Sequence, residues 1–546
     1  MRSREVVMRV SLILFFGLLC VTLLAGSSAS GAEIVVTPGP GAIAAAIAKS
    51  VEGDTLRLGK GVYAESVVIN KRIALVGGPG VVIDSSEAFK PEWKPAAKIG
   101  AGVYRAAVTF RPRTLFLDGK IVAEIDAKEA AEEGPWNWKT LFAKGPPRAG
   151  FKYLLAVWMY HPGEKAVYLR APDSADPAKL NLTCGRSNDP AIRFRDVDGA
   201  SVSDLTIANA HGGVSFGESA KRCVLTRCVI GPWDKTGVSL GGGASENIVE
   251  HNQIFRGALE DWIPHADNAR ERYEIWQLHK SVGYSDRVGV NLLRAGHDNI
   301  IRQNHIYETF DGIDLGDYSI ESLDKPLTSP EDGKGTIIAN NLIERTRDSG
   351  IELGAGCIDV QVYGNILRQT HGGLRFKLPR IGPVFIHHNV LEDGSPFNIW
   401  FSIDDSPARG YVYHNTIVGG SAGLTYSSFV KPHNIGAPNW HFVNNLVMSK
   451  NGFFSNRKTE APVNFTADYN VVTGDHRPWP GEPAKDAHSK YVDKLELGKD
   501  LRPLPDSPAM DAGLDLSKYL DGKPLPGCLP GYFMGQAPDA GAFEVK

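Results

Sequence analysis

Short runs of alternating apolar and polar residues recur along the chain at intervals of about 24 residues. Each run starts with Asn and carries an aliphatic residue two positions later, as in Asn252-Gln-Ile254 and Asn304-His-Ile306. Further runs start at Asn341, Asn365, Asn389, Asn415, Asn445 and Asn470, and those from Leu205 and Cys228 keep the pattern without Asn. A unit of this length, made of β-branched runs and turns, is too short for a helical repeat and lacks the leucine-rich signature. The pattern predicts a parallel β-helix, in which each coil of three short strands pairs with the next coil.

The recurring Asn has a physical explanation in such a coil. Its side chain can bond to the backbone at a tight corner, and Asn residues stacked on neighbouring coils can bond to one another. Two intervals are longer than the rest, from Asn252 to Asn304 and from Asn304 to Asn341. We interpret them as insertions at about 255–288 and 317–335.

A second strand follows the Asn of each coil by about ten residues. Examples are Gly237-Val-Ser-Leu240, Gly312-Ile-Asp-Leu315 and Gly350-Ile-Glu-Leu353. The second and fourth residues are apolar, so strand alternation sends them into the core and the third residue outward. The outward column that results is Ser215, Ser239, Asn291, Asp314, Glu352, Arg375, Trp400 and Thr425. Because neighbouring coils lie about 4.8 Å apart, we expect Asp314 and Glu352 to be direct neighbours.

This carboxylate pair is the candidate catalytic centre. Two stacked carboxylates repel each other, so stability alone does not favour Asp314 beside Glu352. An ordinary solvated charge ladder, with Arg375 relieving the repulsion, is one interpretation. The other is a functional site in which Arg375 and Lys377, two residues further along the strand, join the pair as catalytic residues. The two insertions favour a site because they flank this strand on neighbouring coils and would wall a groove, and Trp400 offers a surface for a sugar ring.

The first insertion and its return to the sheet supply the candidate substrate-binding residues. They are Trp262, Trp276, His279, Asp286, Arg287 and Arg294, together with Asn291 and Trp400 from the column. For each of these residues taken singly, the alternative to substrate binding is an ordinary role as a packing or solvated side chain. Together they would line a groove with cationic and aromatic walls, suited to an acidic or sulfated sugar chain.

Composition and charge narrow the partners and the compartment. A net charge of −3 without a basic block argues against nucleic acid as the main partner. Arginines near the start, an apolar run over 10–25 and the small residues Ser30-Gly31-Ala32 predict a signal peptide over 1–32. We therefore expect a secreted protein, extracellular or periplasmic, with no membrane anchor after cleavage. The sparse, odd set of cysteines beyond residue 32 is neither a disulfide framework nor a zinc site.

Several segments resemble the pectin-lyase-like superfamily of right-handed parallel β-helix proteins. The repeats from about 200 to 473, Gly53–Tyr63 and Ile73–Gly78 look like its coils, and Ala42–Lys49 reads as a short helix capping the solenoid. The segments Ser507–Gly513 and Pro538–Glu544 resemble the ending of secreted bacterial members. The resemblance implies an all-β fold, a right-handed parallel β-helix solenoid with an N-terminal capping helix.

A break in the repeat adds one more unit to this fold. Over 85–185 we expect a small inserted β-rich domain, with a hairpin at Leu115–Val122 and a strand at Ala166–Arg170. Such an insertion is similar to that of xylosidase-type and fucosidase-type β-helix enzymes. The predicted organisation is a signal peptide over 1–32, a cap and first coils over 33–84, the inserted domain over 85–185, the main β-helix over 186–480 and a C-terminal extension over 481–546.

Three functions are compatible with this arrangement. In a glycoside hydrolase, which needs no cofactor, Glu352 beside a like charge would be the acid and Asp314 the nucleophile, although the roles are exchangeable. In a polysaccharide lyase, Asn291, Asp314 and Glu352 would hold Ca²⁺ and Arg375 or Lys377 would be the base, as the resemblance to pectate and alginate lyases implies. In a binding protein the same surface would hold a polysaccharide or oligosaccharide without cleaving it.

Overall fold

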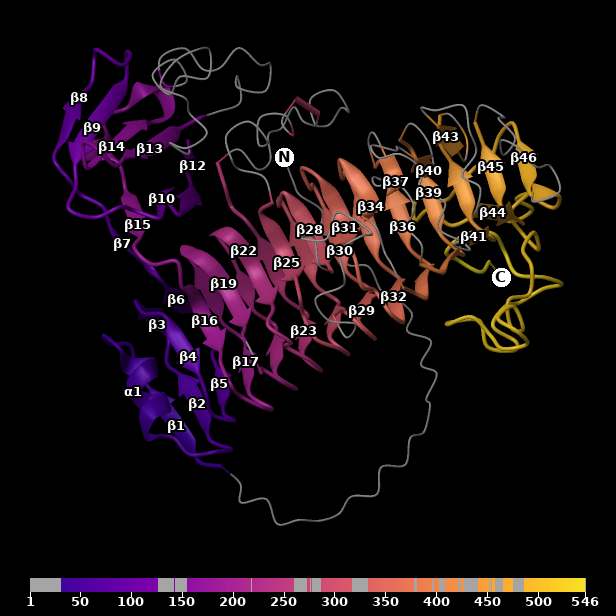
Figure 1. The fold of residues 1–546 in the computed structure, drawn as a ribbon, viewed down its shortest axis with the longest axis horizontal. Helices are drawn as coiled ribbons and strands as arrows, with labels where there is room; N and C mark the ends of the chain where they lie inside the picture. Colours follow the sequence, from indigo (N-terminus) through magenta and orange to yellow (C-terminus); the bar gives the residue numbers. More distant parts are fainter. Residues whose placement is uncertain are drawn as a thin grey trace.

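The computed structural model describes most of the chain between residues 31 and 545. The segments outside the description are 1–30, 126–141, 143–154, 218, 260–272, 275, 277–285, 317–331, 378–380, 395–396, 402–407, 421–423, 427–439, 451, 453, 457–464, 475–485 and 546. The predicted signal peptide therefore lies almost wholly outside the described residues. Figure 1 shows a long solenoid whose strands follow one another along its axis from the N-terminal coils to the C-terminal coils.

Three parallel sheets form the faces of the solenoid. Sheet A consists of β1 (Glu33–Val36), β2 (Thr55–Leu58), β5 (Ala74–Val76), β17 (Ser201–Ser203), β20 (Val224–Thr226), β23 (Ile248–Glu250), β26 (Ile300–Arg302), β29 (Ile337–Ala339), β32 (Val360–Tyr363), β35 (Val384–His387), β38 (Gly410–Tyr413), β41 (Trp440–Val443) and β44 (Phe465–Asp468). Sheet B consists of β3 (Gly61–Tyr63), β6 (Val81–Asp84), β18 (Thr206–Ala208), β21 (Val229–Ile230), β24 (Gln253–Phe255), β27 (His305–Tyr307), β30 (Leu342–Glu344), β33 (Ile366–Arg368), β36 (Val390–Glu392), β39 (Thr416–Val418), β42 (Leu446–Met448), β45 (Val471–Thr473) and β46 (Lys490–Val492).

Sheet C is the face that carries the outward column predicted from the sequence. It consists of β4 (Val67–Ile69), β16 (Pro190–Phe194), β19 (Ala210–Phe216), β22 (Trp233–Leu240), β25 (Val288–Leu292), β28 (Asp311–Leu315), β31 (Ser349–Leu353), β34 (Gly372–Phe376), β37 (Phe397–Phe401), β40 (Leu424–Tyr426) and β43 (Phe454–Asn456). The expected all-β parallel β-helix is therefore confirmed.

A continuous apolar core runs inside the coils. Ile254, Ile306, Ile343 and Leu367, the aliphatic residues that follow the recurring Asn, belong to it and are almost fully buried. The helix α1 (Ala42–Lys49) covers the N-terminal end of this core with Ile43 and Ile47. Without that helix the first coil would expose apolar side chains, so the predicted cap has a clear physical role.

The recurring Asn residues form a buried ladder at the corner between sheets A and B. The Asn365 amide nitrogen donates to Ile338 O and to Asn389 Oδ1, both at 2.9 Å. Its Oδ1 accepts hydrogen bonds from the backbone and side-chain nitrogens of Asn341, both at 3.0 Å. The same side-chain contact joins Asn252 to Asn304 and continues as far as Asn470. The corner role inferred from the spacing is confirmed.

Residues 85–185 leave the solenoid and build two small antiparallel or mixed sheets. One contains β7 (Ser86–Ala88), β10 (Thr114–Leu117), β11 (Lys120–Ile121) and β15 (Leu182–Gly185). The other contains β8 (Trp93–Pro95), β9 (Val103–Ala107), β12 (Ala123–Glu124), β13 (Val157–His161) and β14 (Ala166–Arg170). The predicted hairpin is β10 with β11, and Figure 1 shows this unit beside the N-terminal coils.

This unit contacts the solenoid close to sheet C. The backbone nitrogen of Ile121 donates to Gly257 O, and that of Leu259 donates to Ile121 O, both at 3.0 Å. Thr114 Oγ1 lies 3.3 Å from Asp234 Oδ2 at the start of β22. The inserted unit is thus bonded to the beginning of the first insertion, the segment that follows β24.

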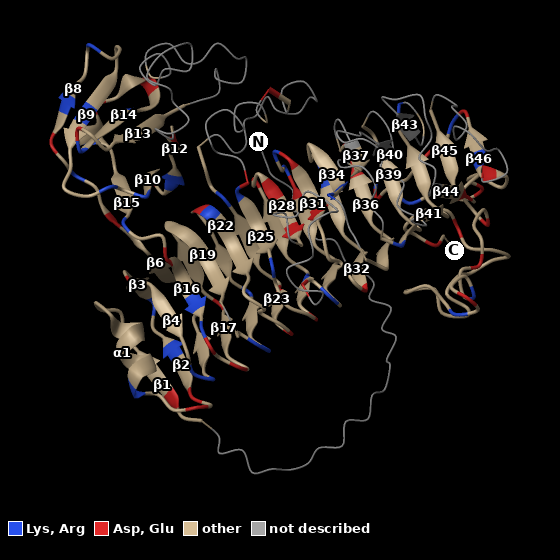
Figure 2. Cartoon of the chain, in the orientation of Figure 1, with Lys and Arg blue, Asp and Glu red and all other residues tan. Residues whose placement is uncertain are grey.

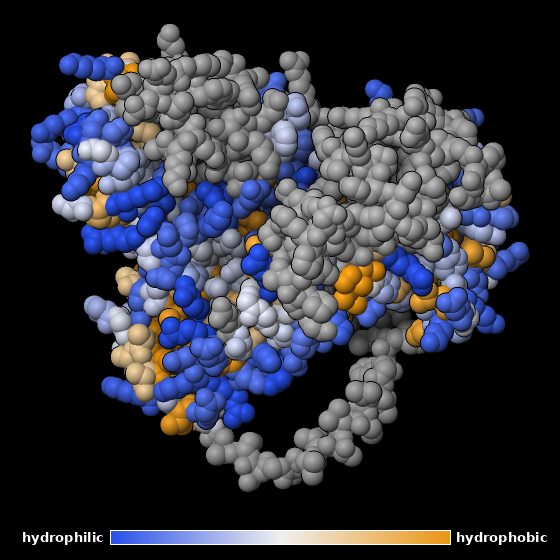
Figure 3. Space-filling model, viewed as in Figure 1, coloured by the Kyte–Doolittle hydropathy of each residue, from blue (hydrophilic) through white to orange (hydrophobic). Residues whose placement is uncertain are grey.

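The C-terminal residues fold back over sheet A. Leu516, Leu525 and Cys528 bury themselves against Phe385 and Tyr413 on the outer surface of this sheet. The five described cysteines are free and buried. In the described part of the chain, no helix is both long and apolar enough to cross a membrane. The surface visible in Figure 3 is mainly hydrophilic where its residues are described.

Candidate functional site

The register of sheet C places the outward column as the sequence predicted. Asn291 pairs with Asp314, Asp314 with Glu352, Glu352 with Arg375, and Arg375 with Trp400. Towards the N-terminus the column continues through small residues, since Ser239 pairs with both Ser215 and Asn291. Figure 2 shows the acidic residues of this face gathered on β28 and β31.

The carboxylates at the centre of the column are buried. Asp314 is 8% exposed and Glu352 is 4% exposed. Asp311, three residues before Asp314 on β28, is 4% exposed, and Asp348, which precedes β31, is 3% exposed. Burying a charge is costly unless it is paired, so a solvated ladder does not describe this cluster.

Glu352 is surrounded by groups that stabilise its negative charge. Its Oε1 lies 3.0 Å from Lys377 Nζ. Its Oε2 accepts a hydrogen bond from Ser349 Oγ at 3.0 Å and one from Arg375 Nη1 at 3.2 Å. The same Arg375 nitrogen lies 3.8 Å from Asp348 Oδ2. Charge-assisted hydrogen bonds of this kind offset much of the cost of burying a carboxylate.

Asp314 has the opposite environment. Its Oδ1 is buried and accepts no hydrogen bond from the described residues. Burial raises the pKa of Asp314 well above its ordinary value, and the neighbouring Glu352 charge raises that pKa further. Lys377 opposes the shift, while Asp286 and Asp348 add to it. A carboxyl group in this position holds its proton more tightly than one in water.

The two cations of the cluster stay protonated. Burial lowers the pKa of Lys377, but the charge and hydrogen bond of Glu352, together with the Asp311 charge, raise it more, so the pKa of Lys377 is raised overall. The pKa of Arg375 is likewise raised, because burial lowers it less than the charges of Glu352, Asp348, Asp311 and Asp314 together raise it. Neither side chain is therefore prepared to accept a proton.

Asp311 is a member of this cluster that the column did not include. One oxygen each from Asp311, Asp314 and Glu352 lies within 4.8 Å of the others, a donor set of the kind that holds a hard cation. Asp311 Oδ1 also accepts the backbone N–H of Ser349 at 2.9 Å. Asn291, the third cation ligand expected from the sequence, instead accepts the N–H of Leu293 with its Oδ1 at 2.8 Å. The sequence feature that indicates Asp311 as a member of the cluster is its position on the same strand, three residues before Asp314.

The donor set does not fit a divalent cation well. Both Glu352 oxygens already contact Lys377, Arg375 or Ser349. A cation bound to Glu352 would lie close to two positive side chains and would have to displace these bonds. The contacts of this cluster therefore favour chemistry without a metal ion.

Trp400 contacts Arg375. The guanidinium carbon of Arg375 lies 4.3 Å from the centroid of the Trp400 ring, within the range of a cation–π interaction. Trp400, which the sequence predicted as a surface for a sugar ring, therefore already contacts the positively charged side chain of Arg375.

The first insertion reaches the candidate site. Trp276 stacks on His371, just before β34, with ring centroids 5.4 Å apart and planes at 11°. Tyr273 stacks in turn on Trp276 at 5.6 Å. The insertion leaves the coil of β24 and so extends to the coil that carries Arg375. Trp262 and His279 lie outside the described residues, and their assignment to substrate binding stays a prediction.

The residues at the return of this insertion are divided between two places. Asp286 is exposed and close enough to Asp314 to affect its pKa. Arg287 turns to Asp234, with Nε 3.7 Å from Oδ1. Arg294 is exposed beyond the end of β25.

Asp234 is the centre of a second buried charge cluster. His211 Nδ1 lies 3.3 Å from one of its oxygens, and Arg256 Nη2 lies 3.9 Å from the other. Burial raises the pKa of Asp234, but Arg287, His211 and Arg256 outweigh it, so the pKa lies well below its ordinary value. This cluster joins sheet C to Thr114 of the inserted unit and was not foreseen from the sequence.

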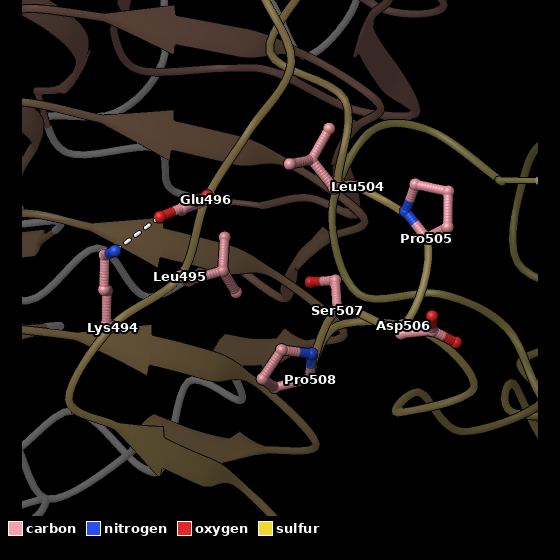
Figure 4. Close-up of a pocket in the computed structure, with 8 residues that line it drawn as sticks. All are labelled: Lys494, Leu495, Glu496, Leu504, Pro505, Asp506, Ser507 and Pro508. Atoms are coloured by element: carbon pink, nitrogen blue, oxygen red, sulfur yellow. Dashed lines mark ion pairs between the residues drawn. The ribbon is translucent and has the colours of Figure 1, made fainter.

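A shallow pocket of about 280 Å³ lies elsewhere, in the C-terminal segment. Its lining comes from Lys494–Glu496 and Leu504–Pro508, and Figure 4 shows the Lys494–Glu496 ion pair at one side. No residue of the sheet C column lines this pocket. The candidate site therefore remains the carboxylate cluster on β28 and β31.

Comparison with known proteins agrees with the observed architecture. Residues 190–377 match a family model described as "Right handed beta helix region". No curated protein sequence matches. Similar solved structures include XylC in complex with xylose (16% identity over 83% of this chain and 84% of that chain, TM-score 0.49). They also include the pectate lyase Pel9A (15% identity, 95% and 98% coverage, TM-score 0.36) and PfbA, a surface adhesin of Streptococcus pneumoniae (10% identity, 79% and 86% coverage, TM-score 0.35).

The similar structures thus include a glycoside hydrolase, lyases and an adhesin, and at identities of 10–15% they assign no activity to this chain. The matched family model and the three parallel sheets agree on one description. The chain is a right-handed parallel β-helix protein.

Proposed function

We propose that this chain is a glycoside hydrolase in which Asp314 is the general acid and Glu352 the nucleophile. The observation that carries the proposal is the unlike environment of two neighbouring carboxyl groups. Glu352 contacts two cations and a hydroxyl donor, whereas Asp314 is buried, has a raised pKa and accepts no hydrogen bond at Oδ1 from the part of the chain that the structure describes. Such a division is the usual mark of an acid and its ionised partner. It reverses the roles first assigned from the sequence.

The reaction follows from these protonation states. Asp314 donates its proton to the glycosidic oxygen as the bond to the anomeric carbon breaks, and the Glu352 carboxylate attacks that carbon. Asp314, now a carboxylate, then removes a proton from the water that cleaves the glycosyl–enzyme ester. Oxygens of the two groups lie within 4.8 Å of each other. This separation supports a retaining mechanism, because inverting enzymes leave about 6.5–9.5 Å for the attacking water.

Arg375, Lys377 and Ser349 act on Glu352 in this proposal. Their contacts compensate the buried Glu352 carboxylate and fix the direction of its oxygens. Raised pKa values keep both cations protonated through the cycle. A polysaccharide or oligosaccharide is the expected substrate.

A panel of plant and algal polysaccharides and aryl glycosides, incubated with and without a chelator, tests this function. We expect saturated reducing ends whose yield is unaffected by the chelator, and a first product with retained anomeric configuration by NMR. Unsaturated ends that disappear with chelator would contradict a hydrolase. Retained binding without any product would instead indicate a carbohydrate-binding protein.

The second candidate is a Ca²⁺-dependent polysaccharide lyase. The mutual proximity of Asp311, Asp314 and Glu352 is the observation in its favour, although Ca²⁺ would have to displace Lys377, Arg375 and Ser349 from Glu352. The base would then be Arg375 or Lys377, and the raised pKa of each opposes that role. Absorbance of the unsaturated product near 230 nm, lost with a chelator and restored by added Ca²⁺, would support this candidate.

The pH dependence should show which group is the acid. Because Asp314 must be protonated to act, activity should fall as pH rises through its raised pKa. Asp286 raises that pKa through its charge, so Asp286→Asn should lower it and move the alkaline limb of kcat/KM to lower pH. Asp359→Asn, an exposed residue directly before β32 whose charge does not contribute to the shift of Asp314, is the matched charge control and should leave the limb in place. An alkaline limb that Asp286→Asn does not move would contradict the assignment of Asp314 as the acid.

A further inference from the structure

Trp400 and Arg375 form a contact across neighbouring strands. They occupy paired positions on β37 and β34, and the guanidinium carbon lies 4.3 Å from the ring centroid. The Arg375 side chain is only 15% exposed. A cation–π contact is strongest when water is largely excluded, because the surrounding dielectric then screens it less. The Trp400 ring therefore packs against a guanidinium that has little contact with water.

The other end of the same guanidinium contacts the carboxylate cluster. Arg375 Nη1 lies 3.2 Å from Glu352 Oε2 and 3.8 Å from Asp348 Oδ2. A planar guanidinium fixed by a ring on its face keeps its N–H groups pointing in set directions. Arg375 thus holds Glu352 Oε2 together with Ser349 Oγ, while Lys377 holds Oε1.

We propose that Trp400 is a positioning residue, which holds Arg375 in the orientation that directs the Glu352 carboxylate. The inference rests on the proposed hydrolase function and replaces the simpler view of Trp400 as a platform for a sugar ring. The two roles predict different kinetics. A platform contributes mainly to substrate binding, so its loss raises KM. A positioning residue acts on the attacking group, so its loss lowers kcat and leaves KM nearly unchanged.

The test compares Trp400→Leu, Trp400→Phe and Arg375→Gln in the full-length protein, with an aryl glycoside that the wild type hydrolyses. Leu fills part of the space without a π face, whereas Phe keeps the face. We expect Trp400→Leu to lower kcat roughly 5- to 30-fold, the scale of a partly buried cation–π contact. KM should stay within about two-fold of the wild type and Trp400→Phe should recover most of the loss. A rise in KM alone, or no recovery with Phe, would overturn the proposal.

A double-mutant cycle shows whether Trp400 acts through Arg375. In the Arg375→Gln background, Trp400→Leu should produce little further loss of kcat, because the group that it positions is absent. Losses that multiply would overturn the inference. The same cycle can be measured on the free energy of unfolding, which requires no enzymatic activity. A coupling energy of zero would show that Trp400 and Arg375 do not interact. If the wild type hydrolyses nothing on the panel, the proposed function fails. Coupling in the unfolding cycle would then show that Trp400 only stabilises the position of Arg375 in the folded protein.

Discussion

Replacing Asp314 with Asn should lower kcat/KM by about 10²–10⁴-fold, the usual contribution of a general acid. Asn has the shape of Asp but no proton to give to the leaving oxygen. Substrates with good leaving groups need less protonation, so the loss should be smaller for a nitrophenyl glycoside than for an alkyl glycoside. Initial rates on both substrates measure this difference.

Stability provides the control for this variant. Because the folded-state pKa of Asp314 is raised, the folded protein favours the protonated form of this carboxyl group. The stability that this preference gives is lost as pH rises through the folded-state pKa. Asn carries no charge, and Asp314→Asn should therefore melt no lower than the wild type at neutral pH. Ser239→Ala, two positions away in the same column, should keep wild-type activity. Full activity in folded Asp314→Asn would exclude Asp314 as the acid.

Replacing Asn365 with Ala should have the largest effect on stability. The side chain is fully buried and bonds to Ile338 O and to the Asn341 backbone nitrogen. Alanine leaves both of these groups without that partner, and each buried unsatisfied group costs about 1–3 kcal/mol. The expected loss is about 2–5 kcal/mol in the free energy of unfolding. Urea denaturation followed by far-UV circular dichroism would measure it.

Gln361→Ala is the matched control for the Asn ladder. Gln361 lies on β32 of the same coil, at a half-buried position that alternates with the core residues. Its replacement should change stability by less than about 0.5 kcal/mol. Equal losses from Asn365→Ala and Gln361→Ala would contradict a special role of the ladder.

The sequence predicted the solenoid and the column well because both depend on periodicity. Strand alternation decides which side of the sheet a residue faces, and the repeat decides which residues lie on neighbouring coils. Those two rules placed Asp314 beside Glu352 and Glu352 beside Arg375. The Asn ladder followed from the same spacing.

Contacts that depend on side-chain conformation or on distant segments were harder to predict. Periodicity brings Arg375 and Trp400 together but does not show that the guanidinium lies over the ring. The contrast between Asp314 and Glu352 depends on burial and on which oxygen meets which cation. The Asp234 cluster joins residues from the inserted unit and several coils, and nothing in its local sequence marks it.

Separate side chains stabilise the solenoid and form the site, although both belong to the same coils. The Asn ladder lies at the corner between sheets A and B, whereas the carboxylate cluster projects from sheet C. Substitutions on the outer surface of sheet C leave every rung of the ladder intact. Such a scaffold is open to evolutionary change, because catalytic groups can be exchanged, or moved by one coil, without a new fold. Divergent activities on one solenoid are the expected result of that freedom.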